Sequence, residues 1–384
     1  MNIEENYREL ESQYMMPAFS RDIMITKGSG CIVTDADGKE YLDLVAGIAV
    51  CGTGHCHPKV VQAIIEQTAE LIHCSNLYYV PHQGKLAKRL VEISGLKGHA
   101  KSFFSNSGAE AMEGAIKLAR VRTGKTDFIA CEGGFHGRTM GSLACTHKPA
   151  IRDPFMPLEP FSAFVPYGDA DAIRDAITHD TAGVVLEPVQ GEGGVIIPPP
   201  GYLKQVREIC DEKEVLLILD EIQTGMGRTG TWFAYQQEGI TPDIVTIAKG
   251  VASGFPMGAI VAREGLEFKR SEHGSTFAGG PIACAAALAT IDVIEEVLPQ
   301  VSAKGQRFGK ALATLNPRVK GLMIGMTIGD TCAAVQKSCA AQGLLVNCAA
   351  NGNLRLVPPL TITNTEIDQA VGIINAAVCE QSRS

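Results

Sequence analysis

The stretch VLLILDEIQTGMGRTG, Val215 to Gly230, together with Lys249 in the segment DIVTIAKG, decides the fold and the chemistry that we expect of this chain. Val215 to Leu219 are consecutive apolar residues followed by Asp220, a pattern typical of a strand buried on both faces of a sheet. A second apolar run, Ile244 to Ile247, ends shortly before Lys249. Because α/β sheets place their chemistry at the carboxyl ends of strands, we expect a carboxylate and an amine at two strand ends.

This pair of groups fits a pyridoxal phosphate site. A lysine can hold the aldehyde of that cofactor covalently, and a carboxylate can keep its pyridine nitrogen protonated, so that the ring accepts electrons. Either residue alone is more often a surface lysine or an aspartate that caps a turn. The long combined pattern, LDEIQTGMGRTG followed by TPDIVTIAKG, resembles the class III (omega) aminotransferases. The resemblance implies that Lys249 and Asp220 are catalytic, that Gln223 contacts the ring hydroxyl, and that Ile222 packs against one face of the ring.

A glycine run within the same stretch has the G-x-G-x-x-G spacing of a dinucleotide-binding turn, formed by Gly225, Gly227 and Gly230. These glycines do not directly follow the strand, and no clear helix start comes after them, so we interpret the match as weak. A nicotinamide-dependent oxidoreductase stays as the alternative from another enzyme class.

Composition bounds the remaining possibilities. The 384 residues are 45% hydrophobic and 20% charged, which predicts a soluble globular protein with a large core. The net charge of −8 argues against general nucleic-acid binding. No apolar run is long enough to span a membrane, and the start MNIEENYREL lacks a signal core, so we expect a cytoplasmic protein. The 12 cysteines form no C-x-x-C motif, so we expect reduced, buried thiols and no metal site.

Alternating strand and helix patterns predict a mostly parallel sheet in the central part of the chain. Phe103 and Phe104 end one strand, and the helix pattern of residues 109–122 follows the turn SNSGA. Ser107, Gly108 and Ala109 therefore lie at a helix amino terminus, where free N–H groups and the helix dipole favour a phosphate. Read alone, the serine is most often a simple helix cap. SNSGAEA resembles the phosphate-binding segment of the family, which favours a role in cofactor binding.

The next strand, residues 127–131, leads into CEGGFHGRT. In the family, the position of Phe135 stacks on the cofactor ring, and that of Arg138 binds the α-carboxylate of the substrate with its guanidinium fork. Without the resemblance, the phenylalanine would be core and the arginine a surface residue. His136 has the residue type of a general base. We do not assign it that role, because Lys249 can transfer the proton itself.

The strand pattern TAGVVLEP, residues 181–188, precedes the loop VQGEGG. In relatives, the position of Glu192 pairs with an arginine near the carboxyl terminus and gates the site between amino donors and 2-oxoglutarate. Here that arginine would be Arg355, in NLRLVPPL. An ordinary surface ion pair is the alternative.

Two further segments carry residues that the family places near the substrate. HGSTFAGGP resembles the loop that reaches the neighbouring subunit, where Thr276 would bind the partner's cofactor phosphate and Ser275 would approach the substrate. A shared threonine implies a homodimer. GIAVCGTGHCHP resembles the segment at the substrate entrance, where Ile48 would contact substrate unless it is only a core residue.

The resemblance covers nearly the whole chain and implies the pyridoxal-phosphate-dependent transferase fold type I. We expect an amino-terminal arm and part of the small domain in residues 1–45, a large cofactor-binding domain in 46–290, and a small α/β domain in 291–384. Strands are expected at residues 28–33, 40–44, 258–262, 321–328 and 343–346. Helices are expected at residues 58–71, 282–297, 301–315, 331–342 and 364–378.

The amino donor is predicted from weaker similarities. VKGLMIGM, GLLVNC and LRLVPPLTI resemble most the family members that transfer the δ-amino group of N-acetylornithine to 2-oxoglutarate in arginine biosynthesis. The segments GIAVCGTGH and TFAGGP support 4-aminobutyrate as the alternative donor. Succinylornithine and a carrier-linked lysine intermediate also remain open, since these substrates differ in a distal tail that no fixed motif reads.

Overall fold

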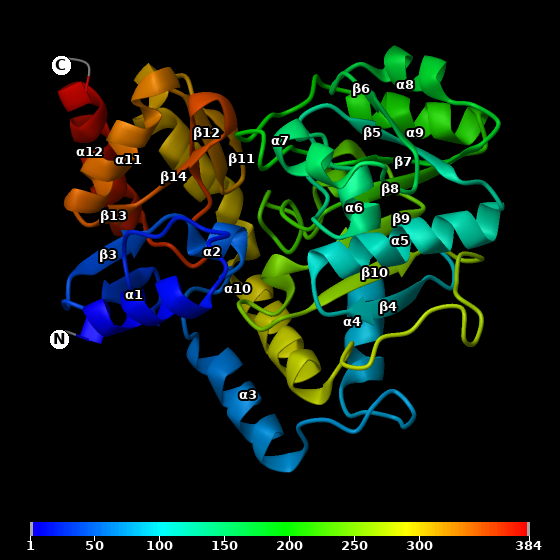
Figure 1. Ribbon diagram of the computed structural model, residues 1–384, viewed down its shortest axis with the longest axis horizontal. Helices are drawn as coiled ribbons and strands as arrows, with labels where there is room; N and C mark the ends of the chain where they lie inside the picture. The colour runs from blue at the N-terminus through cyan, green and yellow to red at the C-terminus, as the bar shows by residue number, and fades with distance from the viewer. Residues whose placement is uncertain (1–2, 382–384) are drawn as a thin grey trace.

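The computed structural model describes residues 3–381 as two lobes, one around a seven-stranded sheet and one that combines both ends of the chain (Figure 1). The large sheet has the order β4-β10-β9-β8-β7-β5-β6. β9, β8, β7, β5 and β6 are parallel, whereas β10 is antiparallel to both of its neighbours. The mostly parallel sheet predicted from the sequence is thus confirmed. Its strands are β4 (Lys101–Ser105), β5 (Asp127–Cys131), β6 (Ser162–Val165), β7 (Thr181–Leu186), β8 (Leu216–Asp220), β9 (Ile244–Ile247) and β10 (Gly258–Ala262).

Both faces of this sheet are covered, which explains why its strands are continuously apolar. In β8, Leu217 and Leu219 belong to one buried cluster, and Leu216 and Ile218 belong to another on the opposite face. Helix α5 (Gly108–Thr123) packs on the second face, while α4 (Gln83–Ser94), α9 (Tyr202–Glu212) and α10 (Pro281–Ala311) contribute to the first. Burying each leucine side chain stabilises the folded state by roughly 1.5–3 kcal/mol. The central strands therefore hold the site rigidly.

The second lobe contains two small sheets, of order β1-β2-β3-β13 and β11-β12-β15-β14. β13 pairs in parallel with β3, so the amino-terminal segment and the carboxyl-terminal segment share one sheet. Figure 1 shows the two ends of the chain on this same side of the molecule. The strands are β1 (Ile25–Ser29), β2 (Ile32–Asp35), β3 (Glu40–Asp43), β11 (Arg318–Lys320), β12 (Met323–Thr327), β13 (Leu344–Leu345), β14 (Asn347–Ala349) and β15 (Asn353–Leu356). The remaining α-helices are α1 (Ile3–Tyr14), α2 (Ala46–Ala49), α3 (Pro58–Glu70), α6 (Met140–Ala144), α7 (Pro149–Arg152), α8 (Ala170–Ala176), α11 (Cys332–Ala341) and α12 (Asn364–Gln381).

The single strand expected at residues 28–33 is wrong. The chain turns at Gly30 and Cys31, and residues on either side form the antiparallel pair β1 and β2. Gly30 has φ 58° and exchanges two backbone hydrogen bonds with His55. A glycine accepts this left-handed conformation at little cost, so the turn is a hairpin that the apolar pattern concealed.

The two separate helices expected at 282–297 and 301–315 are also wrong, because α10 continues through Pro299. A proline inside a helix removes one hydrogen bond and costs about 3 kcal/mol. Here it lies on the exposed side, and the buried face on both sides of it, which includes Ile291, Ile294 and Val301, holds the helix together. The expected domain boundary at residue 290 falls inside this helix.

The expectation that all cysteines are reduced needs a correction. Cys332, at the start of α11, and Cys348, in β14, form a disulfide with a Cα–Cα distance of 5.8 Å. The chain folds back after α11, and Gln336 of that helix accepts a hydrogen bond from the Cys348 N–H at 3.0 Å, which brings the two sulfur atoms together. The other ten cysteines in the described part of the chain are free.

Neither a membrane span nor a metal cluster is found in residues 3–381. None of the helices in this range is both long and apolar enough to cross a bilayer. The same residues contain no group of three or more histidine, cysteine or acidic side chains that could hold a metal ion.

Candidate active site

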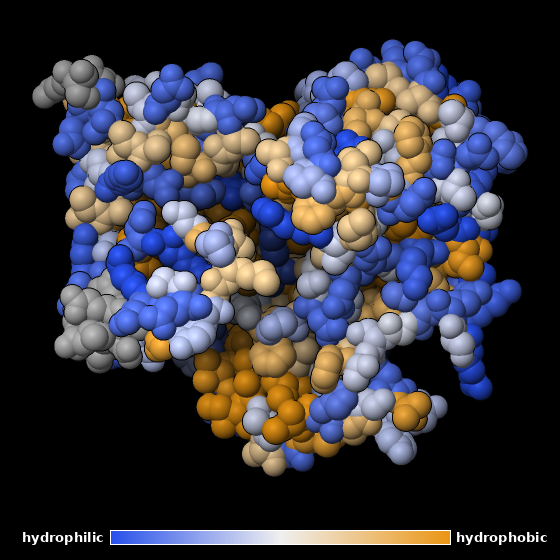
Figure 2. All heavy atoms as spheres, viewed as in Figure 1, coloured by the Kyte–Doolittle hydropathy of each residue, from blue (hydrophilic) through white to orange (hydrophobic). Residues whose placement is uncertain are grey.

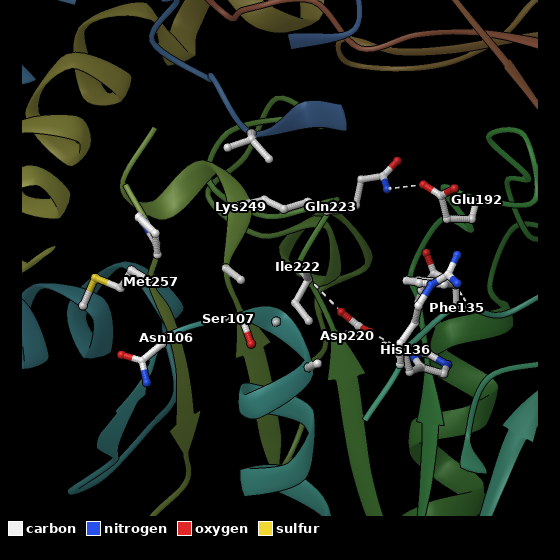
Figure 3. A pocket seen from close by; sticks show the side chains of 18 of the residues that line it. Asn106, Ser107, Phe135, His136, Glu192, Asp220, Ile222, Gln223, Lys249 and Met257 are labelled. Carbon is white, nitrogen blue, oxygen red and sulfur yellow. Dashed lines mark hydrogen bonds and ion pairs between the residues drawn. The ribbon is translucent and has the colours of Figure 1, made fainter. Parts of the chain in front are cut away.

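A cavity of about 430 Å³ lies where β5, β7, β8 and β9 end and α5 begins (Figure 3). Its position follows from the topology, because the carboxyl ends of parallel strands meet at one edge of the sheet. Ten of the residues expected in the site line it: Ser107, Gly108, Ala109, Phe135, Arg138, Glu192, Asp220, Ile222, Gln223 and Lys249.

Asp220 lies at the last position of β8 and is almost completely buried. Its Oδ2 is 2.8 Å from Nδ1 of His136, and its Oδ1 accepts hydrogen bonds from the Ile222 N–H at 3.0 Å and the Thr246 hydroxyl at 3.3 Å. Burial alone would lower the pKa of His136, but the hydrogen bond and the charge of Asp220 raise it overall. The hydrogen bond to His136 thus helps to fix the orientation of the Asp220 carboxyl group.

Lys249 follows β9 after one residue and is half-buried, with its side chain directed into the cavity (Figure 3). Its φ of 45° is unusual for a residue other than glycine, so the surrounding structure holds it in a strained conformation. Burial lowers the pKa of its amine, and the charge of Arg355 acts in the same direction, whereas Glu192 opposes it. The neutral amine that these effects favour is the form that acts as a nucleophile or a base.

The amino terminus of α5 forms another wall of the cavity. The hydroxyl of Ser107 caps the helix by accepting the Glu110 N–H at 3.2 Å. A Cβ atom added to Gly108 would lie 2.9 Å from Cδ1 of Ile222, so only a glycine lets the helix end come this close to the strand end. Backbone N–H groups at this position and the helix dipole together favour an anionic group such as a phosphate.

A further charged side chain, Arg355, is not among the residues that line the cavity but contacts two of them, Glu192 and Gln223. Arg355, on β15, is 1% exposed, and its Nη1 donates to Oε1 of Glu192 at 2.7 Å and to the Gly191 carbonyl at 2.9 Å. Gln223 joins this network by accepting a bond from Arg355 at 3.3 Å and donating to Glu192 at 3.4 Å. Burial raises the pKa of Glu192, but Arg355 lowers it overall, so the two form an ion pair. A guanidinium held by a carboxylate can also receive the carboxylate of a ligand.

These groups fit pyridoxal phosphate by their chemistry. The helix amino terminus suits the phosphate, Asp220 suits a protonated ring nitrogen, and Lys249 suits the aldehyde. Phe135 and Ile222 supply the apolar walls that a planar ring requires.

Three further predicted residues lie outside this cavity. Ser275 and Thr276 line a different cavity of about 740 Å³, and the link to the first one is a 3.1 Å hydrogen bond from Asn106 to the Ser275 hydroxyl. Ile48 is 40% exposed on α2 and is not among the lining residues, whereas Val50 is. The core alternative for Ile48 is therefore wrong, and its contact with substrate stays a prediction.

Sequence reasoning missed two acidic or basic groups in the cavity wall. His136 was considered only as a general base, but it contacts Asp220. Glu187, just beyond β7, is assigned no role by the sequence patterns, yet it lines the cavity and is 5% exposed. Its position directly after the apolar run of a fully buried strand, the same signal that identified Asp220, could have drawn attention to it.

Comparison with known proteins agrees with this chemistry. The family model described as "Aminotransferase class-III" matches residues 15–378. Acetylornithine aminotransferase from Methanosarcina mazei is 53% identical over 98% of both chains, and that from Methanothermobacter thermautotrophicus is 48% identical over 98% of this chain and 99% of its own.

Among solved structures, ornithine aminotransferase from Toxoplasma gondii has a TM-score of 0.94 at 30% identity, covering 100% of this chain and 96% of its own. N-acetylornithine aminotransferase from Stenotrophomonas maltophilia has a TM-score of 0.83 at 34% identity, with coverage of 98% and 99%. A further structure of the Toxoplasma enzyme is described with pyridoxal phosphate at its active site. The chain therefore belongs to the class III aminotransferases, which depend on pyridoxal phosphate.

Proposed function

We propose that this protein transfers the δ-amino group of N-acetylornithine to 2-oxoglutarate, giving N-acetylglutamate semialdehyde and glutamate, a step of arginine biosynthesis. The observation that carries the proposal is that archaeal relatives 44–53% identical over nearly the whole chain are named acetylornithine aminotransferase. The cavity supports it, since Arg138 and Arg355 provide two cationic groups for substrate carboxylates.

The cofactor is assigned to the residues of the first cavity. Ser107, Gly108 and Ala109 would hold its phosphate at the start of α5. Phe135 and Ile222 would flank its ring, with Asp220 at the ring nitrogen and Gln223 at the ring hydroxyl. When bound, pyridoxal phosphate supplies an electron sink for the carbon that loses its proton.

The protein's own groups then bind the substrates and move the proton. Lys249 would hold the aldehyde of the cofactor, and its amine, once released, would accept the proton from the substrate carbon. Burial lowers the pKa of this amine, which favours the neutral form that can accept a proton. Arg138 would bind the α-carboxylate of the donor. Glu192 would hold Arg355 during the donor half-reaction and release it to a carboxylate of 2-oxoglutarate in the second.

We also infer that the protein works as a cytoplasmic homodimer. Thr276 and Ser275 lie outside the first cavity of their own protomer, as expected if they serve that of a partner. Large apolar side chains are exposed beside them, including Phe277 (66%), Leu77 (84%) and Tyr79 (105%). Figure 2 shows a further apolar patch over α3, where Ile65 is exposed. Exposed apolar surface of this kind is typical of subunit interfaces.

The absorbance of the bound cofactor tests the assignment of the donor. Adding N-acetylornithine without a keto acid should remove the visible band of the protein loaded with pyridoxal phosphate, and 4-aminobutyrate in a parallel cell should leave it. A loss of the band with 4-aminobutyrate alone would refute the proposal and favour the other donor. Lys249→Ala is the matched control, because it cannot hold the cofactor through its amine.

A further inference from the structure

The carboxyl group of Glu187 connects two loops that both contribute to the cavity wall, one through Phe135 and the other through Glu192. Its Oε1 accepts the backbone N–H of Phe135 at 3.0 Å, and its Oε2 accepts the backbone N–H of Gly191 at 2.9 Å. The Tyr167 hydroxyl donates to the Glu187 carbonyl at 2.9 Å and so fixes the backbone from which the side chain extends. Both carboxyl oxygens are thus occupied by donors from separate segments of the chain.

Each of these segments carries a group of the candidate active site. The first contains Phe135, which lines the cavity, and its neighbour His136, which contacts Asp220. The second contains Gly191, whose carbonyl accepts a hydrogen bond from Arg355 at 2.9 Å. One side chain therefore lies between the wall that faces the cofactor and the arginine that faces the substrate.

We propose that Glu187 is a positioning residue of the aminotransferase reaction. Its carboxyl group fixes the position of the Phe135 segment relative to the Gly191 segment. This inference rests on the cofactor of the family and not on the identity of the amino donor. Glu187 needs no contact with the reacting atoms. It acts through Phe135 and His136 on the cofactor side and through Gly191 and Arg355 on the substrate side.

The charges around Glu187 are consistent with such a role. Burial raises the pKa of Glu187 to about 7, and the charge of Asp220 acts in the same direction. The charge of His136 and the two backbone N–H donors oppose this rise. Other titratable groups that interact with it are Lys249, Tyr167 and Cys131. The two N–H donors thus help to keep the carboxyl ionised, and an ionised carboxyl accepts both bonds at once.

Glu187→Gln is the informative substitution, because it keeps the size of the side chain and changes one acceptor into a donor. The amide nitrogen would face a backbone N–H, leaving one buried donor without a partner. A buried donor that loses its acceptor lowers the equilibrium constant for the conformation in which it is buried by a factor of about 5 to 150. Glu132→Gln is the matched control, since this exposed residue lies in the Phe135 segment and takes part through its backbone. Its carbonyl accepts from Gln190 at 2.7 Å, and its N–H donates to the Val165 carbonyl at 2.8 Å.

The experiment measures cofactor binding and substrate binding separately. The apoprotein is titrated with pyridoxal phosphate by fluorescence, and the KM for 2-oxoglutarate is then determined at saturating cofactor. We expect Glu187→Gln to raise the cofactor Kd by about 5- to 150-fold and to raise the KM for 2-oxoglutarate, with both values of Glu132→Gln unchanged. The cofactor titration needs no amino donor, so its result stands even if the proposed donor is wrong.

An unchanged cofactor Kd together with an unchanged KM in Glu187→Gln would overturn the proposal. If that variant does not fold, Glu187→Asp keeps both acceptor oxygens but shortens their reach by one methylene group. Glu187→Asp should retain the fold, judged by circular dichroism, and show a smaller rise of the cofactor Kd. A folded Glu187→Asp with the Kd and KM of the parent protein would equally overturn it.

Discussion

The ion pair between Glu192 and Arg355 should set the affinity of the site for the keto acid. In the absence of substrate the two side chains are 2.7 Å apart, with Arg355 1% and Glu192 28% exposed. A carboxylate of 2-oxoglutarate that uses this arginine must first displace Glu192. Glu192→Gln leaves a neutral side chain of the same size, which competes less strongly for the guanidinium.

The size of the effect follows from the two kinds of hydrogen bond. A bond between charged groups contributes about 1.5–3 kcal/mol, and a neutral one about 0.5–1.5 kcal/mol. Because Glu192 keeps some contact with solvent, we take the lower part of this range and expect a difference of about 1–1.5 kcal/mol. Since 1.4 kcal/mol corresponds to a factor of ten, the KM for 2-oxoglutarate should fall about 5- to 10-fold in Glu192→Gln.

Single-turnover kinetics measures this effect for each half-reaction. The pyridoxamine form of the protein is mixed with increasing 2-oxoglutarate, and the recovery of the cofactor absorbance gives the dissociation constant of the keto acid. Glu212→Gln serves as the control, since it breaks the exposed ion pair with Arg174, in which the glutamate side chain is 56% exposed. An unchanged or higher dissociation constant in Glu192→Gln would show that Arg355 is not the group that Glu192 withholds from the keto acid.

Three further predictions concern the reacting amine and the stability of the fold. Lys249→Ala should abolish multiple turnover, measured as steady-state formation of glutamate, and normal turnover would exclude this lysine as the catalytic amine. Reduction of the disulfide between Cys332 and Cys348, whose sequence separation is 16, should lower the free energy of unfolding by up to about 3 kcal/mol in denaturant titrations with and without a dithiol. Asp243→Asn should destabilise the fold by about 3–5 kcal/mol in the same titrations, because Arg207 would lose its buried partner at 2.8 Å. Burial raises the pKa of Asp243 but Arg207 lowers it overall, below the ordinary value of 3.8, so this contribution is present above about pH 4 and is lost as the pH falls through the folded pKa.

Several features of the site could be predicted because their signals are local. A run of apolar residues followed by a polar one identifies both the strand and its end, which is how Asp220 and Lys249 were found. The start of α5 was likewise visible as a turn followed by helix-forming residues. In a parallel sheet these local ends meet at one edge, so the position of the cavity followed from the strand pattern.

Other features depended on contacts between residues far apart in the chain. The bond between His136 and Asp220 joins residues 84 positions apart, and that between Arg355 and Gly191 joins residues 164 apart. The continuity of α10 through Pro299 was likewise decided by packing, since local propensity alone favours a break there.

The sequence by itself determined β8, β9 and the start of α5, together with the polar residues at their ends, because apolar periodicity and turn chemistry act over a few residues. Only the tertiary structure decided which side chains share a hydrogen bond, as Glu187 does with Phe135 and Gly191. It also decided that Thr276 lies outside the first cavity. Such pairings depend on how the helices and strands pack against one another, and no local pattern encodes that geometry.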